Sequence, residues 1–137
     1  MDQLTIYTLG AAKENPGPAV IGVIVVNEKG EEVLSLAESI GNATNDYAEY
    51  FAAVRAFQAL KDLLGDKTKT TQFELKSQSS LVINHLSAKA EIKDVSLIGH
   101  FIEIYNLRVA SFPELKITLV ADRNKEVEEL VVKKLRI

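Results

Sequence analysis

Residues 4–27 read LTIYTLGAAKENPGPAVIGVIVVN, and this stretch decides the fold. Leu4–Leu9 is rich in β-branched and aromatic residues, so we predict a strand there. Residues 10–18 contain glycine, asparagine and two prolines, which favour turns. Ala19–Asn27 is almost continuously apolar, as is typical of a strand that is covered on both faces. The stretch therefore predicts two strands joined by a turn, within a layered domain.

Beyond this stretch, the pattern predicts a third strand and then an alternation of helices and strands. Residues 28–30 form a hairpin turn before a strand at Glu32–Ile40. Residues 41–45 break the β pattern, and Thr44 or Asn45 can cap a helix that runs to about Leu64 and ends at Gly65. The remaining predicted elements are a strand at Thr70–Lys76, a short helix from Ser79 to Leu86, a helix from Asp94 or Ser96 with Leu97, Phe101, Ile104, Tyr105 and Arg108 on one side, a strand at Leu115–Val120, and a helix capped by Asn124. This order implies an α/β fold with a mixed sheet, in one domain of residues 1–137.

Composition excludes several classes of protein. The 137 residues include no cysteine, which excludes disulfides, thiolate zinc sites and a cysteine nucleophile. Lys and Arg number 16 against 19 for Asp and Glu, so the net charge of -3 gives no support for nucleic-acid binding by the chain as a whole. No run approaches the roughly 18 apolar residues of a membrane helix, and the N-terminus lacks a signal pattern. We therefore expect a cytoplasmic protein without membrane association.

Three short strings then point to a family. They are IYTLG at residues 6–10 with NPGP at 15–18, GNATNDYAEY at 41–50, and SSLVINHL at 79–86. Together with the order of elements, they make the chain resemble type 1 ribonuclease H, especially the compact stand-alone form of bacteria and archaea. The resemblance covers essentially the whole chain. It implies a ribonuclease H-like fold, with a five-stranded mixed sheet in the order 3-2-1-4-5 and helices on both faces.

The resemblance also implies a chemistry and a set of site positions. The family cleaves the RNA strand of an RNA–DNA hybrid with two divalent metal ions, which four carboxylates hold. The family positions fall here at Leu9, Glu49, Gln78 and Glu128. Because Leu9 and Gln78 are not carboxylates, we expect a degenerate active site with no catalytic residue and no metal site, and Glu49 and Glu128 are only weak candidates for metal ligands. No cofactor is expected; Mg²⁺ or Mn²⁺ would enter only if the site is rearranged.

Four other positions match places that contact the hybrid backbone in the family. They are Asn15, Thr44, Asn45 and Ser79. The same residue types also suit a turn and two helix N-caps without any role in binding. Glu14 opposes binding because it puts a negative charge beside the expected phosphate path, and the lysines nearby are few: Lys13, Lys89 and Lys93. His85 and His100 are interpreted as structural.

Three functions therefore stay open. The first is a pseudoenzyme: a non-catalytic module that binds an RNA–DNA hybrid or duplex nucleic acid through these four residues. The second is a structural or protein-interaction domain with no nucleic-acid role, whose partner is another protein or a second copy. The third is an active metal-dependent hybrid endonuclease with a rearranged site, which would need Glu49, Glu128 and borrowed acids. The TN pair at residues 44–45 favours the first function, and the acidic balance favours the second.

Overall fold

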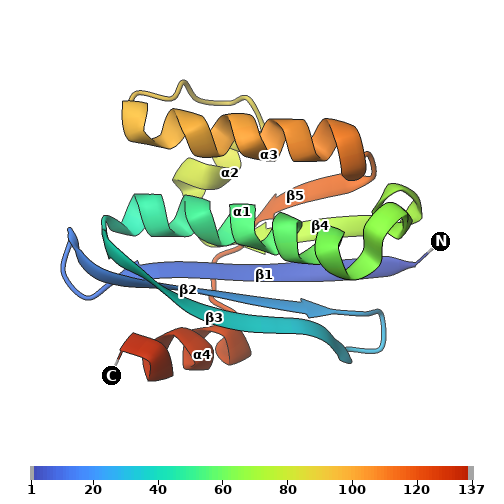
Figure 1. The fold of residues 1–137 in the computed structure, drawn as a ribbon, viewed down its shortest axis with the longest axis horizontal. Coiled ribbons are helices and arrows are strands. Elements are labelled where there is room, and N and C mark those ends of the chain that lie inside the picture. The colour runs from blue at the N-terminus through green and yellow to red at the C-terminus, as the bar shows by residue number, and fades with distance from the viewer. Residues whose placement is uncertain (1, 136–137) are drawn as a thin grey trace.

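The computed structural model describes residues 2–135 and contains a five-stranded mixed sheet with helices on both faces (Figure 1). The sheet order is β3-β2-β1-β4-β5, which confirms the predicted topology. β1 pairs antiparallel with β2 and β2 antiparallel with β3, whereas β1–β4 and β4–β5 are parallel. The strands are β1 (Gln3–Ala12), β2 (Gly17–Val26), β3 (Glu32–Ala43), β4 (Gln72–Ser77) and β5 (Leu115–Leu119), and the helices are α1 (Asn45–Leu64), α2 (Ser80–Leu86), α3 (Ile98–Ser111) and α4 (Lys125–Leu135).

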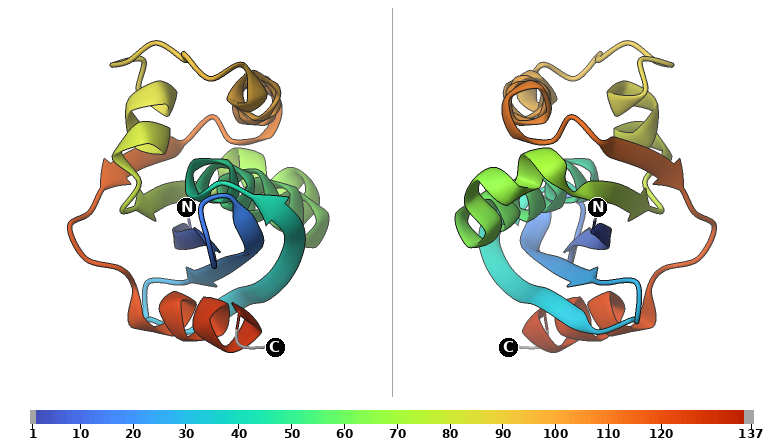
Figure 2. Two further views of the ribbon diagram at one scale, coloured as in Figure 1. Left: turned by 90° about the vertical axis from the view of Figure 1, so that its left-hand side faces the viewer. Right: turned by 90° about the vertical axis from the view of Figure 1, so that its right-hand side faces the viewer.

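The apolar strand β2 is covered on both faces, as its sequence predicts. On one face Ile21 packs with Ala48 of α1. On the other face Val20 packs with Val127 of α4, and Figure 2 shows α4 on the side of the sheet opposite α1. The approach of α4 is close, because a Cβ atom added to Gly22 would lie 2.7 Å from Cγ2 of Val131.

The helices α1 and α4 begin at the predicted capping residues, whereas α3 begins at Ile98, later than predicted, after a 3-10 turn at Val95–Leu97 that Asp94 caps. Thr44 Oγ1 accepts a hydrogen bond from the backbone N–H of Tyr47 at 3.1 Å, and α1 ends at Gly65, whose φ is +57°. Asn124 Oδ1 accepts from the N–H of Val127 at 2.9 Å and so caps α4. Within residues 2–135, none of the helices has both the length and the apolar character that crossing a bilayer requires.

Two predicted loops are shorter than expected. Residues 10–12 extend β1, residues 17 and 18 belong to β2, and residues 41–43 extend β3, so the expectation that residues 41–45 break the β pattern is wrong for the first three of them. Gly41 has a φ of +79°, and the register of β2 against β3 shifts between Ala19 and Val20. A bulge with glycine at positive φ bends a strand without ending it. The extended hairpin brings residues 13–16 close to the start of α1.

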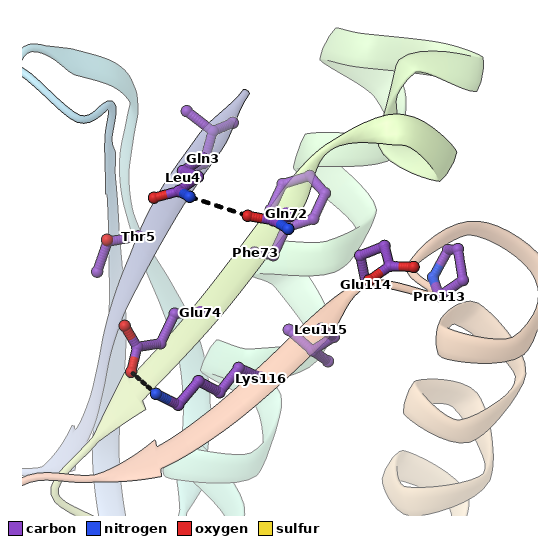
Figure 3. Close-up of a pocket in the computed structure, with 10 residues that line it drawn as sticks. All are labelled: Gln3, Leu4, Thr5, Gln72, Phe73, Glu74, Pro113, Glu114, Leu115 and Lys116. Carbon is purple, nitrogen blue, oxygen red and sulfur yellow. Dashed lines mark hydrogen bonds and ion pairs between the residues drawn. The ribbon is translucent and has the colours of Figure 1, made fainter. Parts of the chain in front are cut away.

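The outer part of the sheet around β4 and β5 carries polar side chains that pair with one another (Figure 3). Gln3 Nε2 donates to Gln72 Oε1 at 2.9 Å, and Lys116 Nζ lies 3.8 Å from Glu74 Oε2. These residues line a cavity of about 470 Å³. None of the predicted site residues lines it, so this cavity is not our candidate site.

Candidate functional site

The candidate site lies where the parallel strands β1 and β4 end. Leu9 and Gln78 each follow by two residues the last paired positions of these strands, Tyr7 and Lys76. A pocket of about 300 Å³ opens there. Larger cavities lie elsewhere in the described chain, but they do not contain several of the predicted site residues, as this pocket does. The pocket is lined by Gly10, Ala11, Asn45, Asp46, Glu49, Gln78, Ser79, Ser80, Leu81 and Arg123.

Arg123 is the common neighbour of three predicted metal positions. Its Nε donates to Gln78 Oε1 at 2.9 Å, and its Nη1 lies 3.7 Å from Glu128 Oε2. The amide nitrogen of Gln78 donates in turn to the carbonyl of Ala121 at 3.0 Å, which fixes the orientation of the amide. Burial raises the pKa of Glu49, and the positive charge of Arg123 partly offsets this rise. A guanidinium therefore stands among the side chains that the resemblance assigns to metal ions.

Sequence reasoning missed Arg123. The residue lies in the connection between β5 and α4, directly before the capping Asn124. A signal was present, because a cation five residues before Glu128 is well placed to reach that carboxylate across the start of a helix. Only the tertiary fold shows that it reaches Gln78 as well.

Leu9 belongs to the hydrophobic core. Its side chain is 2 % exposed and clusters with apolar residues of β2 and α4, namely Val20, Ile24, Val127 and Val131. An apolar cluster therefore fills the first predicted metal position, next to the helix that carries Glu128.

Glu49 is the half-buried carboxyl of the site. Its Oε1 accepts a hydrogen bond from the backbone N–H of Gly10 at 2.5 Å. Burial raises the pKa of Glu49 to about 7, while the Gly10 hydrogen bond and the charge of Arg123 act in the opposite direction and Asp46 adds to the rise. The charged form of this carboxyl is therefore disfavoured by its surroundings.

Replacing Glu49 by glutamine is expected to change the pH dependence of stability. Burial raises the pKa of Glu49 from its usual value of 4.5 to about 7 in the folded protein, so the folded state binds the proton more tightly and loses stability as pH rises through this window. Glu49→Gln keeps an oxygen for Gly10 but removes the titration. The free energy of unfolding of the variant should rise relative to the parent by up to about 3 kcal/mol between pH 4.5 and 8.

Urea denaturation in EDTA at several pH values measures this difference. Glu91→Gln, in the connection that precedes α3, controls for the loss of one negative charge from the whole protein. A difference between parent and Glu49→Gln that stays constant over this pH range would show that the Glu49 carboxyl does not titrate there.

The residues present do not fit two divalent ions. Within residues 2–135, no three or more His, Asp or Glu side chains are grouped so that they could hold a metal. Of the four predicted positions, Leu9 has no ligand atom, Gln78 uses both ends of its amide, and Glu128 faces Arg123. Magnesium in proteins is bound through carboxylate oxygens and water, so this donor set is poor. No chemical step is therefore derived through a metal.

Asn15 and Asn45 form a linked pair beside the pocket. Asn15 Oδ1 accepts from the backbone N–H of Asn45 at 2.9 Å, and Asn45 Oδ1 accepts from the N–H of Ala12 at 2.7 Å. Both side-chain oxygens are thus held internally at exposed positions. Each amide also carries an NH₂ group, which is a hydrogen-bond donor, at an exposed residue.

The other two predicted contact residues serve first as helix caps. Thr44 caps α1, and Ser79 Oγ accepts from the N–H of Val82 at 3.2 Å at the start of α2. The histidines lie in the helical layer, as expected: His85 Nδ1 is 2.6 Å from the hydroxyl of Tyr50, and His100 stacks on Phe51.

Comparisons with known proteins agree with this architecture. The family model for RNase H matches residues 1–128. Among solved structures, LC11-RNase H1, isolated from compost by a metagenomic approach, is 32% identical with a TM-score of 0.89 over 98% of this chain and 99% of that one. RNase H1 from the halophilic archaeon Halobacterium salinarum NRC-1 is 30% identical with a TM-score of 0.86 over 98% of both chains.

The curated relatives match over shorter segments. Ribonuclease HI of Halobacterium salinarum is 36% identical over 91 residues, which are 66% of this chain and 43% of that protein. Ribonuclease H of Hahella chejuensis is 41% identical over 61 residues, 44% of this chain and 40% of that protein. The matched segments thus span about two fifths of these relatives. The sheet order, the acidic residue on α1 and the match to the family model define the class, and the chain belongs to the RNase H family.

Proposed function

We propose that this chain binds RNA–DNA hybrid without cleaving it. The contrast between the two parts of the site carries the proposal. Next to the pocket, a hydrogen-bonded pair of asparagines carries amide donors at exposed positions. Inside the pocket, Arg123 binds Gln78, and at the first family position Leu9 is buried in the core beside α4 and has no ligand atom.

The proposed binding of the hybrid depends on the amide groups of Asn15 and Asn45, whose oxygens are held by backbone N–H groups. Because their oxygens are already bonded to backbone N–H groups, the NH₂ groups are held in position before any ligand arrives. Such donors suit phosphate oxygens and the 2′-hydroxyl groups that distinguish RNA from DNA. A related protein supports this direction: LC11-RNase H1 has been crystallised in complex with RNA/DNA hybrid.

The proposed loss of cleavage depends on the charges of the side chains at the four family positions and of Arg123 beside them. Catalysis with two metal ions requires a clamp of anionic oxygen ligands around the reacting phosphate. In this chain the guanidinium of Arg123 lies 3.7 Å from Glu128 Oε2, and Glu49 is a half-buried carboxyl bonded to the backbone N–H of Gly10. Arg123 keeps two of its nitrogens near protein acceptors, and its remaining N–H groups are able to donate to a phosphate oxygen.

The proposal is tested by titrating labelled RNA–DNA hybrid, DNA duplex and RNA duplex at several salt concentrations. We expect the hybrid to bind best, with a dissociation constant in about the micromolar range. Because the net charge of the chain is -3, only a few phosphates should be neutralised, and the dependence of log K on log salt should correspond to roughly two or three of them. Binding should be the same in magnesium and in EDTA. No binding of any of the three nucleic acids would favour a protein-interaction domain instead.

Asn15→Asp sharpens the test. The variant keeps the oxygen that accepts from Asn45 but replaces the NH₂ donors by a negative charge. It should weaken hybrid binding by about tenfold or more, since a lost hydrogen bond to a charged group amounts to about 1.5–3 kcal/mol. Gln72→Glu makes the same change in charge at the opposite end of β4 and should leave binding unchanged.

A further inference from the structure

The outer surface of α3 carries a continuous row of exposed apolar side chains, here called the α3 stripe. Its members are Val95, Ile98, Ile102, Tyr105 and Val109, with exposed fractions of 78, 38, 52, 58 and 70%. Figure 2 shows α3 at the outside of the molecule, beyond α1 and β5. The sequence pattern groups Tyr105 with Ile104 on one side of this helix, but the structure separates them: Ile104 is fully buried and Tyr105 is 58 % exposed. The helix is therefore apolar on two sides, and only one of them is used by the fold.

The spacing of the α3 stripe is that of a helix-pairing surface. Val95 lies in the 3-10 turn that precedes α3, and the members within α3, from Ile98 to Val109, follow one another at intervals of four, three and four residues, which is the spacing of the a and d positions of a heptad. A scattered set of exposed apolar residues needs no explanation, whereas a contiguous one on a single helix marks an interaction surface. The stripe therefore suits the apolar face of another helix.

A groove runs beside the α3 stripe and can receive protruding side chains. It has a volume of about 470 Å³ and is lined by residues of α3 and by Lys61 of α1. Small residues widen it: Gly99 and Ala110 belong to the lining, and a Cβ atom added to Gly99 would meet nothing within 4 Å. Ile102 borders both the groove and the stripe, so the two form one surface.

The charges at the two ends of the α3 stripe are complementary. Asp94 is exposed directly before Val95, where its Oδ1 accepts from the N–H and the hydroxyl of Ser96, and Arg108 directly precedes Val109 at the other end. Within the described chain, Arg108 is half-buried, donates to the carbonyl of Leu86 and has no carboxylate partner. Burial also lowers the pKa of this guanidinium, so an anion beside it would be stabilising. Two antiparallel copies of the helix bring Asp94 of each copy to Arg108 of the other.

We propose that the α3 stripe is a self-association surface, through which two copies of the chain pair with their α3 helices antiparallel. A two-fold axis near Ile102 makes the surface self-complementary and forms the Asp94–Arg108 contact twice. A parallel pair would instead place like charges together. None of the stripe residues lines the pocket around Arg123, so this inference is independent of the proposed function.

The size of the surface sets the expected strength of the dimer. Stable complexes bury about 800 Å² on each partner. A helix of 14 residues is only about 21 Å long, so a pair of α3 helices offers a small interface and the dimer should be weak. We therefore expect a dissociation constant of about 10–100 µM.

Sedimentation velocity between about 1 and 300 µM tests the proposal, and the weight-average mass should rise from that of a monomer towards that of a dimer. Ile102→Glu should weaken association at least about tenfold. Because Ile102 is 52 % exposed, the variant should keep its circular dichroism spectrum and melting temperature. Leu63→Glu, at a 53 % exposed position of α1 outside the stripe, is the matched control and should associate like the parent. A parent that stays monomeric at 300 µM, or an Ile102→Glu variant that dimerises like the parent, would overturn the proposal.

A charge exchange tests the antiparallel direction. Arg108→Glu alone should weaken association, since it faces Asp94 of the second copy with a like charge. Adding Asp94→Lys to the same chain should restore association, because lysine and glutamate then face each other. A double variant that associates less than Arg108→Glu alone would indicate parallel pairing and refute this arrangement.

Discussion

The unmodified chain is expected to leave a labelled RNA–DNA hybrid uncut in magnesium or manganese, whereas a triple variant with Leu9→Asp, Gln78→Asp and Arg123→Ala is expected to cut it. The triple change would place four carboxylates at the end of β1 and β4 and remove the guanidinium among them. Removing one group that stabilises a transition state commonly costs a factor of about 100–1000 in rate. Restoring a complete metal clamp should therefore raise cleavage by at least about 100-fold.

The double change without Arg123→Ala is expected to fail. Arg123 would then remain beside Gln78→Asp and Glu128, and its positive charge would exclude a divalent ion from the same space. The comparison of double and triple variants thus isolates the arginine. Cleavage by contaminant-free unmodified protein would refute the proposed loss of catalysis.

Leu9→Asp also has a cost in stability that provides a second measurement. The change removes a buried leucine from the α4 cluster and puts a carboxylate near Glu49 and Glu128. The lost burial alone amounts to about 2–3 kcal/mol. If metal ions bind the triple variant, its melting temperature should rise with magnesium concentration, while that of the parent should not. A folded triple variant that binds metal but never cuts would mean that the hybrid-binding surface is not functional.

Gly10→Ala is expected to be among the most destabilising single substitutions in the chain. A Cβ atom at this position would lie 2.1 Å from the carbonyl carbon of Ala48 and 2.4 Å from the backbone nitrogen of Glu49. These are backbone atoms, so β1 and α1 must separate to make room. We expect a loss of about 3 kcal/mol or more and a fall in melting temperature of about 10 °C.

The matched control for Gly10→Ala is Gly99→Ala. Gly99 lies in the first turn of α3, and an added Cβ would meet nothing within 4 Å. Alanine favours the helix over glycine by up to about 1 kcal/mol, so this variant should be neutral or more stable. Thermal unfolding of both variants measures the contrast. A similar effect of the two substitutions would show that the close approach of β1 to α1 is not tight.

The parts of the fold that local sequence signals determine could be predicted. Thr44 and Gly65 mark the ends of α1 because a capping hydroxyl and a glycine at positive φ act within a few residues. The apolar run of β2 predicted its cover by helices on both faces. The length of β3 could not be predicted, because the bulge near Gly41 depends on pairing with β2, which is a contact distant in sequence.

The sequence could predict which residues occupy the candidate site, but it could not predict which side chains contact one another there. Of the four positions that the resemblance implies, Glu49 and Gln78 line one pocket, whereas Leu9 and Glu128 do not line it. The resemblance gave no sign of Arg123, because the partners of that side chain come from β4 and α4 and meet only in the folded chain. The exposed side of α3 was also hidden from the sequence, since a helix that is apolar on two sides does not reveal which side faces the core.

The last helix has a larger part in the site than its peripheral position suggests. α4 covers Leu9 with Val127 and Val131, and Arg123 reaches Gln78 from the segment that leads into the same helix. A local unfolding of α4 would therefore uncover Leu9 and withdraw the guanidinium in one event. Because Glu128 belongs to α4, the site would lose a carboxylate together with its cation.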